Sequence, residues 1–166
     1  MQLPSWLALV APIFVLAGVT ACQAPARSIE ESPDHASIRS SLSDLYTAFC
    51  FDPGEQADWE AQRSLFAEGA TFVAPFAPGT TPRAVDTEQF LADFQQFIRT
   101  SPLGESGYHE RITDLDIESF GGIAHAFVSF EGFVPGEPAD RRGIDSIQLV
   151  RDGDAWLVAS FTTQYE

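Results

Sequence analysis

Residues 142–161 read RGIDSIQLVRDGDAWLVASF and contain two runs in which apolar and polar residues alternate, one on each side of Asp152-Gly153. Alternation with a period of two is typical of a strand with one buried face, and Asp-Gly is a frequent two-residue hairpin turn. The stretch therefore predicts an antiparallel hairpin. Counting back from the turn gives one apolar row of pairs: Leu149 with Trp156, Ile147 with Val158, and Asp145 with Ser160. An acid, Asp145, ends this apolar row.

The other face of this hairpin mixes apolar and polar side chains. Its pairs are Gln148 with Leu157, Ser146 with Ala159, and Ile144 with Phe161. If helices cover the first face, a partly apolar second face is left for contact with another subunit. We therefore expect a homodimer.

A second hairpin is predicted upstream, around Gly121-Gly122. One face of its first strand is acidic and carries Asp114, Asp116 and Glu118. The opposite face is apolar. Continued alternation, with Thr113 opposite Phe130, places Arg111 and His109 at the end of this apolar face. We therefore expect Arg111 and His109 to point inward.

Three helices are predicted before the hairpins. The first has an apolar stripe at helical spacing, made of Ile38, Leu42, Leu45, Tyr46 and Phe49. The second is expected to start at an Asp58 cap and to continue through Phe66 to a stop at Gly69, followed by a strand over 70–74. The third starts at an Asp86 cap and carries the clearest stripe, made of Phe90, Leu91, Phe94, Phe97 and Ile98.

This order of helices and strands predicts a single α+β domain. Over nearly all of residues 36–166, the predicted domain, the chain resembles the nuclear transport factor 2-like superfamily, which includes the SnoaL-like proteins. The resemblance rests on LFAEGATF at 65–72, on GIAHAFV at 122–128 and on the hairpin at 142–158. It implies a cone-shaped fold in which a curved antiparallel sheet wraps three N-terminal helices.

The resemblance also implies a pocket in the mouth of the cone, suited to a small apolar or aromatic molecule. Residues expected to bind this ligand are Trp59, Phe76, Phe94, Arg111 and Phe130. In the ketosteroid isomerase branch, Tyr46 matches the oxyanion-hole tyrosine and Asp145 the oxyanion-hole acid. The general base of that branch is replaced by Ala74, before Pro75-Phe76, and alanine cannot abstract a proton. That isomerisation is therefore not expected unless another base, such as His109, has taken this role.

A tyrosine and a carboxylic acid in an apolar site form a useful pair of donors, because burial keeps the acid protonated and able to donate to an oxyanion. Structural roles remain open for each candidate. Tyr46 can be a core residue with its hydroxyl satisfied, while Asp145 can be ionised and paired with Arg111 or Arg142. His109 can be an edge residue at the start of its strand.

The first 21 residues carry no charged side chain and are mostly apolar. The run is short for a membrane span of about 20 residues and resembles the signal peptide of a bacterial lipoprotein, with VTAC at 19–22 as the lipobox. The resemblance implies cleavage before Cys22, lipidation of its thiol and export to the cell envelope, with Gln23 favouring an outer membrane where one exists. Lys and Arg are missing before the apolar run, which leaves an uncleaved anchor as the alternative. Residues 22–35 are expected to form a flexible tether.

Composition and motifs exclude several classes of partner. All nine cationic residues are arginines, spread along a chain whose net charge is −15, so nucleic acid is not expected to bind. The three histidines lack metal-binding spacing, and no Gly-rich phosphate loop follows a predicted strand, so neither a metal nor another cofactor is expected. Cys50 lies between two phenylalanines and is interpreted as a small core residue.

The sequence supports three hypotheses about function. The leading one is a lipid-anchored protein whose cone binds a small apolar or aromatic ligand. The second is a SnoaL-like isomerase, cyclase or dehydratase that uses Tyr46, His109 and Asp145. The third is a protein-interaction module that uses its outer sheet face. The second hypothesis fails in this form if the three candidate side chains do not converge within hydrogen-bond reach of one cavity.

Overall fold

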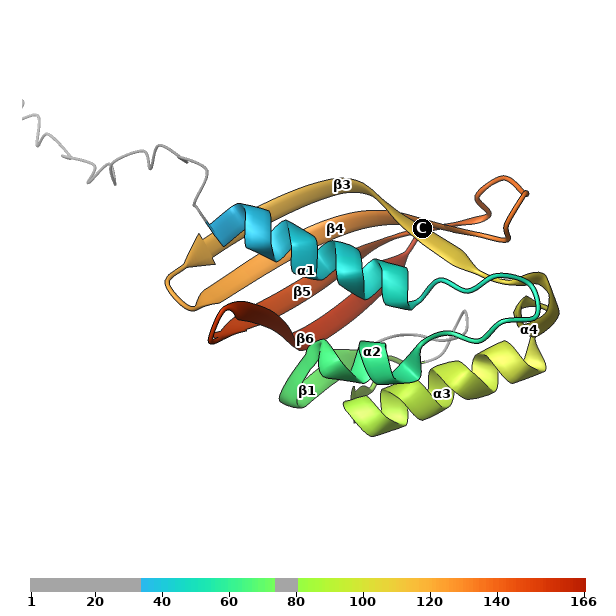
Figure 1. Cartoon of the computed structure of the whole chain (residues 1–166), viewed down its shortest axis with the longest axis horizontal. Helices are drawn as coiled ribbons and strands as arrows, with labels where there is room; N and C mark the ends of the chain where they lie inside the picture. The colour runs from blue at the N-terminus through green and yellow to red at the C-terminus, as the bar shows by residue number, and fades with distance from the viewer. Residues whose placement is uncertain (1–33, 74–80) are drawn as a thin grey trace, which may run out of the picture. The chain divides into compact units, whose positions relative to one another are not determined.

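The computed structural model describes residues 34–73 and 81–166 (Figure 1). The predicted signal peptide, Cys22, Ala74 and Phe76 lie outside the described residues. The described elements, in chain order, are α1 (Asp34–Ala48), α2 (Trp59–Ser64), β1 (Phe66–Val73), β2 (Ala84–Asp86), α3 (Thr87–Thr100), α4 (Leu103–Ser106), β3 (His109–Phe120), β4 (Ile123–Phe133), β5 (Arg141–Asp152) and β6 (Ala155–Tyr165).

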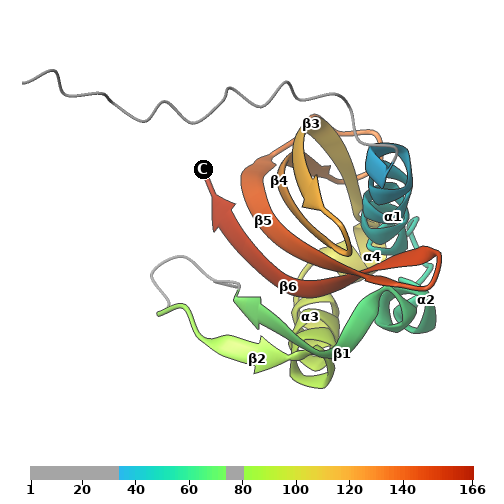
Figure 2. The same cartoon turned by 90° about the vertical axis from the view of Figure 1, so that its left-hand side faces the viewer.

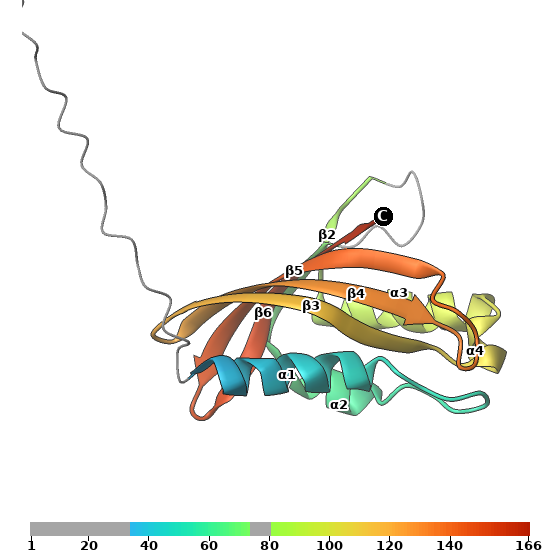
Figure 3. The same cartoon turned by 90° about the horizontal axis from the view of Figure 1, so that it is seen from above.

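The strands form one curved six-stranded sheet in the order β2-β1-β6-β5-β4-β3. Figures 2 and 3 show the sheet curving around α1 and α3. α1 contacts β3 and β6, and α3 contacts β1. The α+β prediction is confirmed, with the addition that β1 pairs with β6 in parallel while the other pairs are antiparallel. Of the described helices, none is long and apolar enough to cross a bilayer.

The hairpin formed by β3 and β4 has the predicted register near its turn, where Phe120 faces Ile123. The register shifts further along the strands, and Phe130 faces Ile112, not Thr113 as predicted. Thr113 is the extra residue of a β-bulge. The predicted turn is therefore confirmed, and the predicted register beyond the bulge is wrong.

The bulge reverses which side chains of β3 face inward. Beyond it, Glu110 faces the buried Gly132 of β4, so Glu110 and Ile112 lie on the inner face. A shift of one residue moves every following side chain to the other side of a sheet. The prediction that Arg111 and His109 lie on the inner face is therefore wrong.

The hairpin formed by β5 and β6 turns one residue later than predicted, at Gly153-Asp154. Gly153 has a φ of 59°, a backbone region that favours glycine, and this fixes the position of the turn. With a further register shift in mid-strand, Asp145 faces Thr163 and not the predicted Ser160. The alternation along β5 does not depend on its turn, so Asp145 lies on the inner face as predicted.

The predicted caps of the second and third helices are confirmed. The Ala61 backbone N–H donates to Asp58 Oδ1 at 2.9 Å, and the Gln89 backbone N–H donates to Asp86 Oδ1 at 2.8 Å. Each bond satisfies one of the backbone donors that a helix start leaves without a partner. The two cap residues therefore fix where α2 and α3 begin.

The second helix is shorter than predicted. α2 ends at Ser64, and β1 begins at Phe66, whose partner in β6 is Val158. The Phe66 ring is buried against Phe72, with 4.8 Å between the ring centres, and this packing overrides the helical spacing of the sequence. Gly69, the predicted helix stop, lies within β1.

The first helix begins at Asp34, so the last residues of the segment predicted as a tether, 22–35, are helical. His35 is buried in the domain. The Asp34 carboxylate pairs with Arg151 at the end of β5. This ion pair attaches the start of α1 to the sheet. The composition of residues 22–35 alone does not predict it, because Arg151 is distant in the sequence.

The core lies between the inner face of the sheet and the helices. Phe72 and Phe90 stack with 4.3 Å between ring centres, and Phe66 meets Phe72 edge-on. We call these three residues the aromatic core. Phe161 of β6 lies 6.2 Å from Phe72, so the rings bring β1, β6 and α3 together.

Candidate functional site

Asp145 is a buried acid that meets a tyrosine of the first helix. Asp145 is 2% exposed on β5, and Tyr46 is 4% exposed on α1. The Tyr46 hydroxyl donates to Asp145 Oδ2. Burial raises the pKa of Asp145 to about 7, although the Tyr46 hydrogen bond and the nearby Thr163 side chain act in the opposite direction. Burial and the neighbouring carboxylate also raise the pKa of Tyr46, so this hydroxyl keeps its proton.

The second oxygen of Asp145 has no such donor. Asp145 Oδ1 is buried and has no hydrogen-bond partner among the described residues. Leaving a buried polar atom without a partner costs about 1–3 kcal/mol. A ligand hydroxyl or amide could donate to this oxygen, and the protonated acid could instead donate to a ligand carbonyl.

A second acid, Glu110, faces the same space. The Tyr108 hydroxyl donates to Glu110 Oε1 at 2.6 Å. The pKa of Glu110 is raised to about 7, chiefly by burial; the Tyr108 hydrogen bond and Arg141 lower it, and the Asp145 carboxylate raises it. Because each of the two acids has a raised pKa, a proton can be held or released here near neutral pH. We call Tyr46, Tyr108, Glu110 and Asp145 the carboxyl site.

Aromatic rings form the apolar surroundings of the carboxyl site. Phe130 is 3% exposed and lies 6.2 Å from the Tyr46 ring and 6.1 Å from the Tyr165 ring. Gly143 makes room for Phe130, because a Cβ there would lie 2.8 Å from the ring. Gly132 likewise makes room for Tyr108, since a Cβ there would lie 2.5 Å from the hydroxyl oxygen. Two glycines of neighbouring strands therefore allow rings to lie flat over the inner face.

The structure brings two of the three predicted catalytic residues together. Tyr46 and Asp145 are bonded to each other, and Tyr46 is at the same time part of the core. His109 is on the other side of β3, where its Nε2 lies 2.9 Å from Asp52 Oδ1. The physical reason is the bulge at Thr113, which turns Glu110 toward Asp145 in place of His109.

Arg111 also lies away from the carboxyl site. It is exposed and pairs with Glu131, which accepts a bond from Arg142 as well. The alternative that Asp145 pairs with Arg111 or Arg142 is therefore wrong, since both arginines are held by Glu131. Hydrogen bonds of this exposed trio fix the outer side of β3, β4 and β5 and do not touch the inner face.

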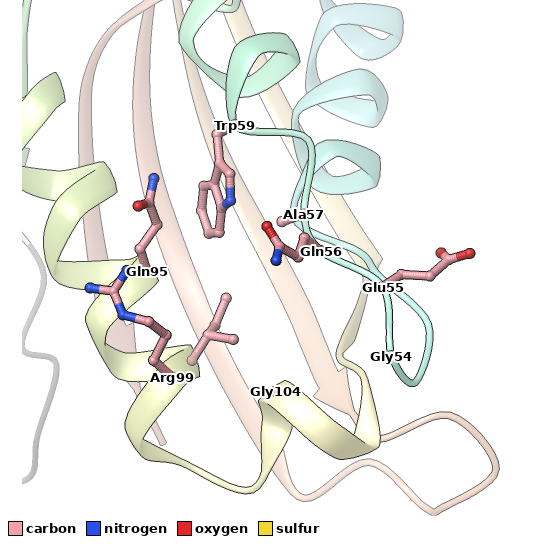
Figure 4. A pocket seen from close by; sticks show the side chains of 9 residues that line it. Gly54, Glu55, Gln56, Ala57, Trp59, Gln95, Arg99 and Gly104 are labelled. Carbon is pink, nitrogen blue, oxygen red and sulfur yellow. The ribbon is translucent and has the colours of Figure 1, made fainter.

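The predicted apolar ligand residues fall into two groups. Phe130 lies against the carboxyl site, whereas Trp59 and Phe94 meet edge-on at 5.8 Å beyond it. Phe76 lies outside the described residues. Trp59 also lines a cavity of about 280 Å³ between the loop before α2, α3 and α4 (Figure 4). The residues predicted to bind one ligand therefore lie in two places: Phe130 at the carboxyl site, and Trp59 at this cavity.

Glu110 and Tyr108 were not predicted as site residues, although the sequence carries a signal for them. Ile112 and Leu115 are separated by three positions, whereas strict alternation requires an even number. This break predicts a bulge at Thr113, and counting through it turns Glu110 inward. The tyrosine two residues before Glu110 then becomes its natural partner.

Two further candidates, a metal site and a reactive cysteine, find no support among the described residues. Among them, no group of three or more His, Cys, Asp and Glu side chains could hold a metal. Cys50 is half-buried, and burial raises the pKa of its thiol. Its sulfur accepts from the Glu110 backbone N–H at 3.3 Å, so Cys50 helps to fix the strand that carries Glu110.

Solved structures provide the comparison, since no protein-family model and no curated protein matches the sequence. The structure is similar to a protein of unknown function with a cystatin-like fold from Nostoc punctiforme, with a TM-score of 0.65 and 10% identity over 81% of this chain and 92% of that chain. A nuclear transport factor 2-like protein of unknown function from Shewanella baltica has a TM-score of 0.52 and 16% identity over 80% of this chain and 94% of that chain. The chain has the nuclear transport factor 2-like fold.

A further nuclear transport factor 2-like protein of unknown function, from Silicibacter pomeroyi, gives a TM-score of 0.53 and 16% identity over 79% of this chain and 94% of that chain. The predicted cone-shaped fold is confirmed. Identities this low establish the fold and not the chemistry. Within the nuclear transport factor 2-like fold of this chain, any functional conclusion therefore depends on the carboxyl site itself.

Proposed function

We propose that this domain binds a small apolar or aromatic molecule that carries one polar group, held at the carboxyl site. The observation that carries the proposal is Asp145 Oδ1, a buried oxygen without a hydrogen-bond partner among the described residues. Its neighbour oxygen is already held by Tyr46, so the acid is fixed in place before any ligand arrives. A ligand pays less entropy when its partner group is already ordered.

The surroundings of Asp145 support the nature of the ligand. Phe130 and Tyr165 present rings beside the acid, and rings bury apolar area effectively. Ligand sites of this kind combine apolar walls with few polar groups, which fix the orientation of the ligand. A fused aromatic ring with a single hydroxyl fits both features.

Calorimetry with 2-naphthol as the probe, and naphthalene as its counterpart without a hydroxyl, tests this proposal. We expect 2-naphthol to bind saturably and Asp145→Leu to weaken it by about tenfold, because the hydroxyl loses its partner. Asp114→Leu is the matched control, since Asp114 is an exposed acid on the outer face. Circular dichroism checks that each variant is folded. Equal affinity of wild type and Asp145→Leu for 2-naphthol would refute the proposal.

We also propose that the chain is exported and attached to the cell envelope through lipid on Cys22, in the outer membrane where one exists. The apolar first 21 residues and VTAC at 19–22 support this location. Labelling cells with an alkyne analogue of palmitate tests it. We expect the full chain to take up label and Cys22→Ser to take up none. Cys50→Ser is the matched control and keeps its label.

A second candidate function is proton transfer by an isomerase, cyclase or dehydratase, favoured by Glu110. This acid occupies the place predicted for His109 and has a pKa of about 7, suited to a general base. Tyr46 and protonated Asp145 would donate to the oxyanion. Exchange of the α-hydrogens of 2-tetralone in deuterated buffer, followed by NMR, tests it. We expect faster exchange than in buffer alone, loss in Glu110→Gln and no change in His109→Gln.

The outer face of the sheet supports a homodimer. Ile123, Phe127 and Ile144 are 60%, 50% and 43% exposed, and we call them the outer patch. Single exposed apolar residues are common, but a group on one face indicates a contact surface. We propose that two copies of the chain meet through this patch. A different partner protein, as in the third hypothesis, would leave the isolated chain monomeric at all concentrations.

A further inference from the structure

A second hollow lies outside the carboxyl site. Trp59, Gln56, Gln95 and Arg99 surround it in Figure 4, and its volume is about 280 Å³. Ligand pockets for drug-sized molecules measure about 300–1,000 Å³, so this cavity suits a smaller molecule. At about 30 Å³ for each water molecule in the liquid, it has room for roughly nine of them.

A wall of apolar residues separates this cavity from the carboxyl site. Phe51, Ala57, Leu103 and Tyr108 form a second buried cluster, and Ile98 packs against it. Ala57 and Ile98 face the cavity, while the Tyr108 hydroxyl bonds to Glu110 on the other side. The two sites can therefore be occupied and tested independently.

Arg99 brings an uncompensated positive charge to the cavity. Among the described arginines, those in ion pairs with carboxylates are Arg63, Arg83, Arg111, Arg142 and Arg151. Arg99 is not among them, and within the described residues its guanidinium donates only to Gln96 Oε1, at 2.9 Å. The guanidinium therefore keeps donors that an external carboxylate could accept from.

The other lining groups add an aromatic surface and a side-chain amide. Trp59 is half-buried, packs against the second cluster and lines the cavity. The Gln95 side chain also lines the cavity, and its amide end lies on the side of Trp59 in Figure 4. The Glu55 carboxylate points away from the hollow in the same view, so it does not oppose an anion there.

We propose that this cavity binds a small aromatic carboxylate. The carboxylate would accept bonds from the Arg99 guanidinium and the Gln95 amide, and the ring would lie against Trp59 and Ile98. Arginine suits this role because its planar donors match a carboxylate in two parallel bonds. The volume limits the ligand to about one ring with short substituents.

NMR of the full chain labelled with ¹⁵N-tryptophan tests the proposal, with benzoate as the probe. Trp59→Phe assigns the indole signal of Trp59. We expect benzoate to shift that signal saturably and Arg99→Gln to weaken its binding by about tenfold. Arg39→Gln is the matched control, because Arg39 is also exposed and outside the ion pairs of the described residues. Benzamide, which lacks the charge, should bind about tenfold more weakly than benzoate.

Two further measurements separate this proposal from the proposed function. Benzoate should bind Asp145→Leu as it binds wild type, whereas 2-naphthol should bind Asp145→Leu about tenfold more weakly. Raising sodium chloride from about 0.05 to 0.5 M should weaken benzoate and leave 2-naphthol unaffected, because salt screens charge pairs. A Trp59 signal that never saturates, or equal affinity in wild type and Arg99→Gln, would overturn the proposal of the Arg99 cavity without bearing on Asp145.

Discussion

The aromatic core and the carboxyl site lie on the inner face of the same sheet but differ in composition. Phenylalanine rings form the first, and two acids with their tyrosine partners form the second. Around Phe72 the space is filled by stacked rings that touch β1, β6 and α3. Around Asp145 the same sheet carries two acids, each bonded to a tyrosine. A domain of this size needs only one such filled region to be stable. The comparison shows one inner face that is filled by rings at one end and carries two buried acids at the other.

The largest effect is expected in the aromatic core. Phe72→Ala removes a fully buried ring that stacks on Phe90, and such changes cost about 3–5 kcal/mol of the free energy of unfolding. Urea denaturation measures this loss. Phe120→Ala, at a ring that is 69% exposed, is the matched control and should change stability by less than about 0.5 kcal/mol. Equal losses in the two variants would contradict the assignment of the core.

The next largest effect is a pH dependence that belongs to the carboxyl site. Burial raises the pKa of Asp145 from its ordinary value of 3.8 to about 7. Between these values the folded state keeps a proton that the unfolded state has lost, so stability falls as pH rises through this window. Asp145→Asn has no carboxyl proton to release, so this contribution to the loss of stability with rising pH is absent in the variant. From about pH 5 to about pH 8, we expect the variant to lose about 2–3 kcal/mol less than wild type in urea denaturation.

The general acidity of the chain calls for a control in this experiment. A net charge of −15 also lowers stability as pH rises, through repulsion that any one substitution barely changes. Asp114→Asn removes an exposed acid and should follow the wild-type pH curve. Parallel curves for wild type and Asp145→Asn would show that burial does not hold a proton on Asp145.

A smaller effect should follow from filling the space beside Tyr108. A Cβ at Gly132 would lie 2.5 Å from the Tyr108 hydroxyl oxygen, so Gly132→Ala displaces the ring from Glu110. Overpacking of this kind costs about 1–2 kcal/mol. The lost hydrogen bond should also raise the pKa of Glu110, measured by NMR titration of its carboxyl carbon, since that bond lowers it. Gly122→Ala, whose Cβ has room, should leave that pKa unchanged.

The smallest effect on stability is expected at the outer patch. Phe127→Ser changes a residue that is 50% exposed and should alter the free energy of unfolding by less than about 0.5 kcal/mol. It should nevertheless turn the proposed dimer into a monomer, measured by light scattering. Asp114→Ser on the neighbouring strand should leave the mass unchanged. A wild-type chain that is monomeric at high concentration would rule out the dimer.

Local patterns in the sequence were sufficient to predict much of the fold. The caps at Asp58 and Asp86 and the turn at Gly121-Gly122 depend on neighbouring residues alone, and all three are confirmed. The pairing of Tyr46 with Asp145 was accessible because alternation along β5 places the acid inward whatever the turn does. The resemblance to a known superfamily then matched Tyr46, on the predicted first helix, and Asp145 to an oxyanion-hole pair.

The remaining parts depend on contacts that alternation does not encode. The bulge at Thr113 exchanged His109 for Glu110, and only the uneven spacing of Ile112 and Leu115 reports it. Phe66 was predicted to be helical but lies in β1, because its ring packs against Phe72. The helical spacing of the sequence does not show this contact. A count of residues along a strand is reliable only as far as the next bulge.

The strand order has a consequence for how the chain is made. β6 (Ala155–Tyr165) lies inside the sheet between β1 and β5, although it follows every other described strand in the chain. Until it emerges, β1 and β2 have no link to the other strands, and contacts between such distant segments form slowly. The sheet of the nascent chain therefore stays incomplete until β6 has been synthesised. For an exported protein, as proposed here, this delay gives time for translocation before the sheet closes.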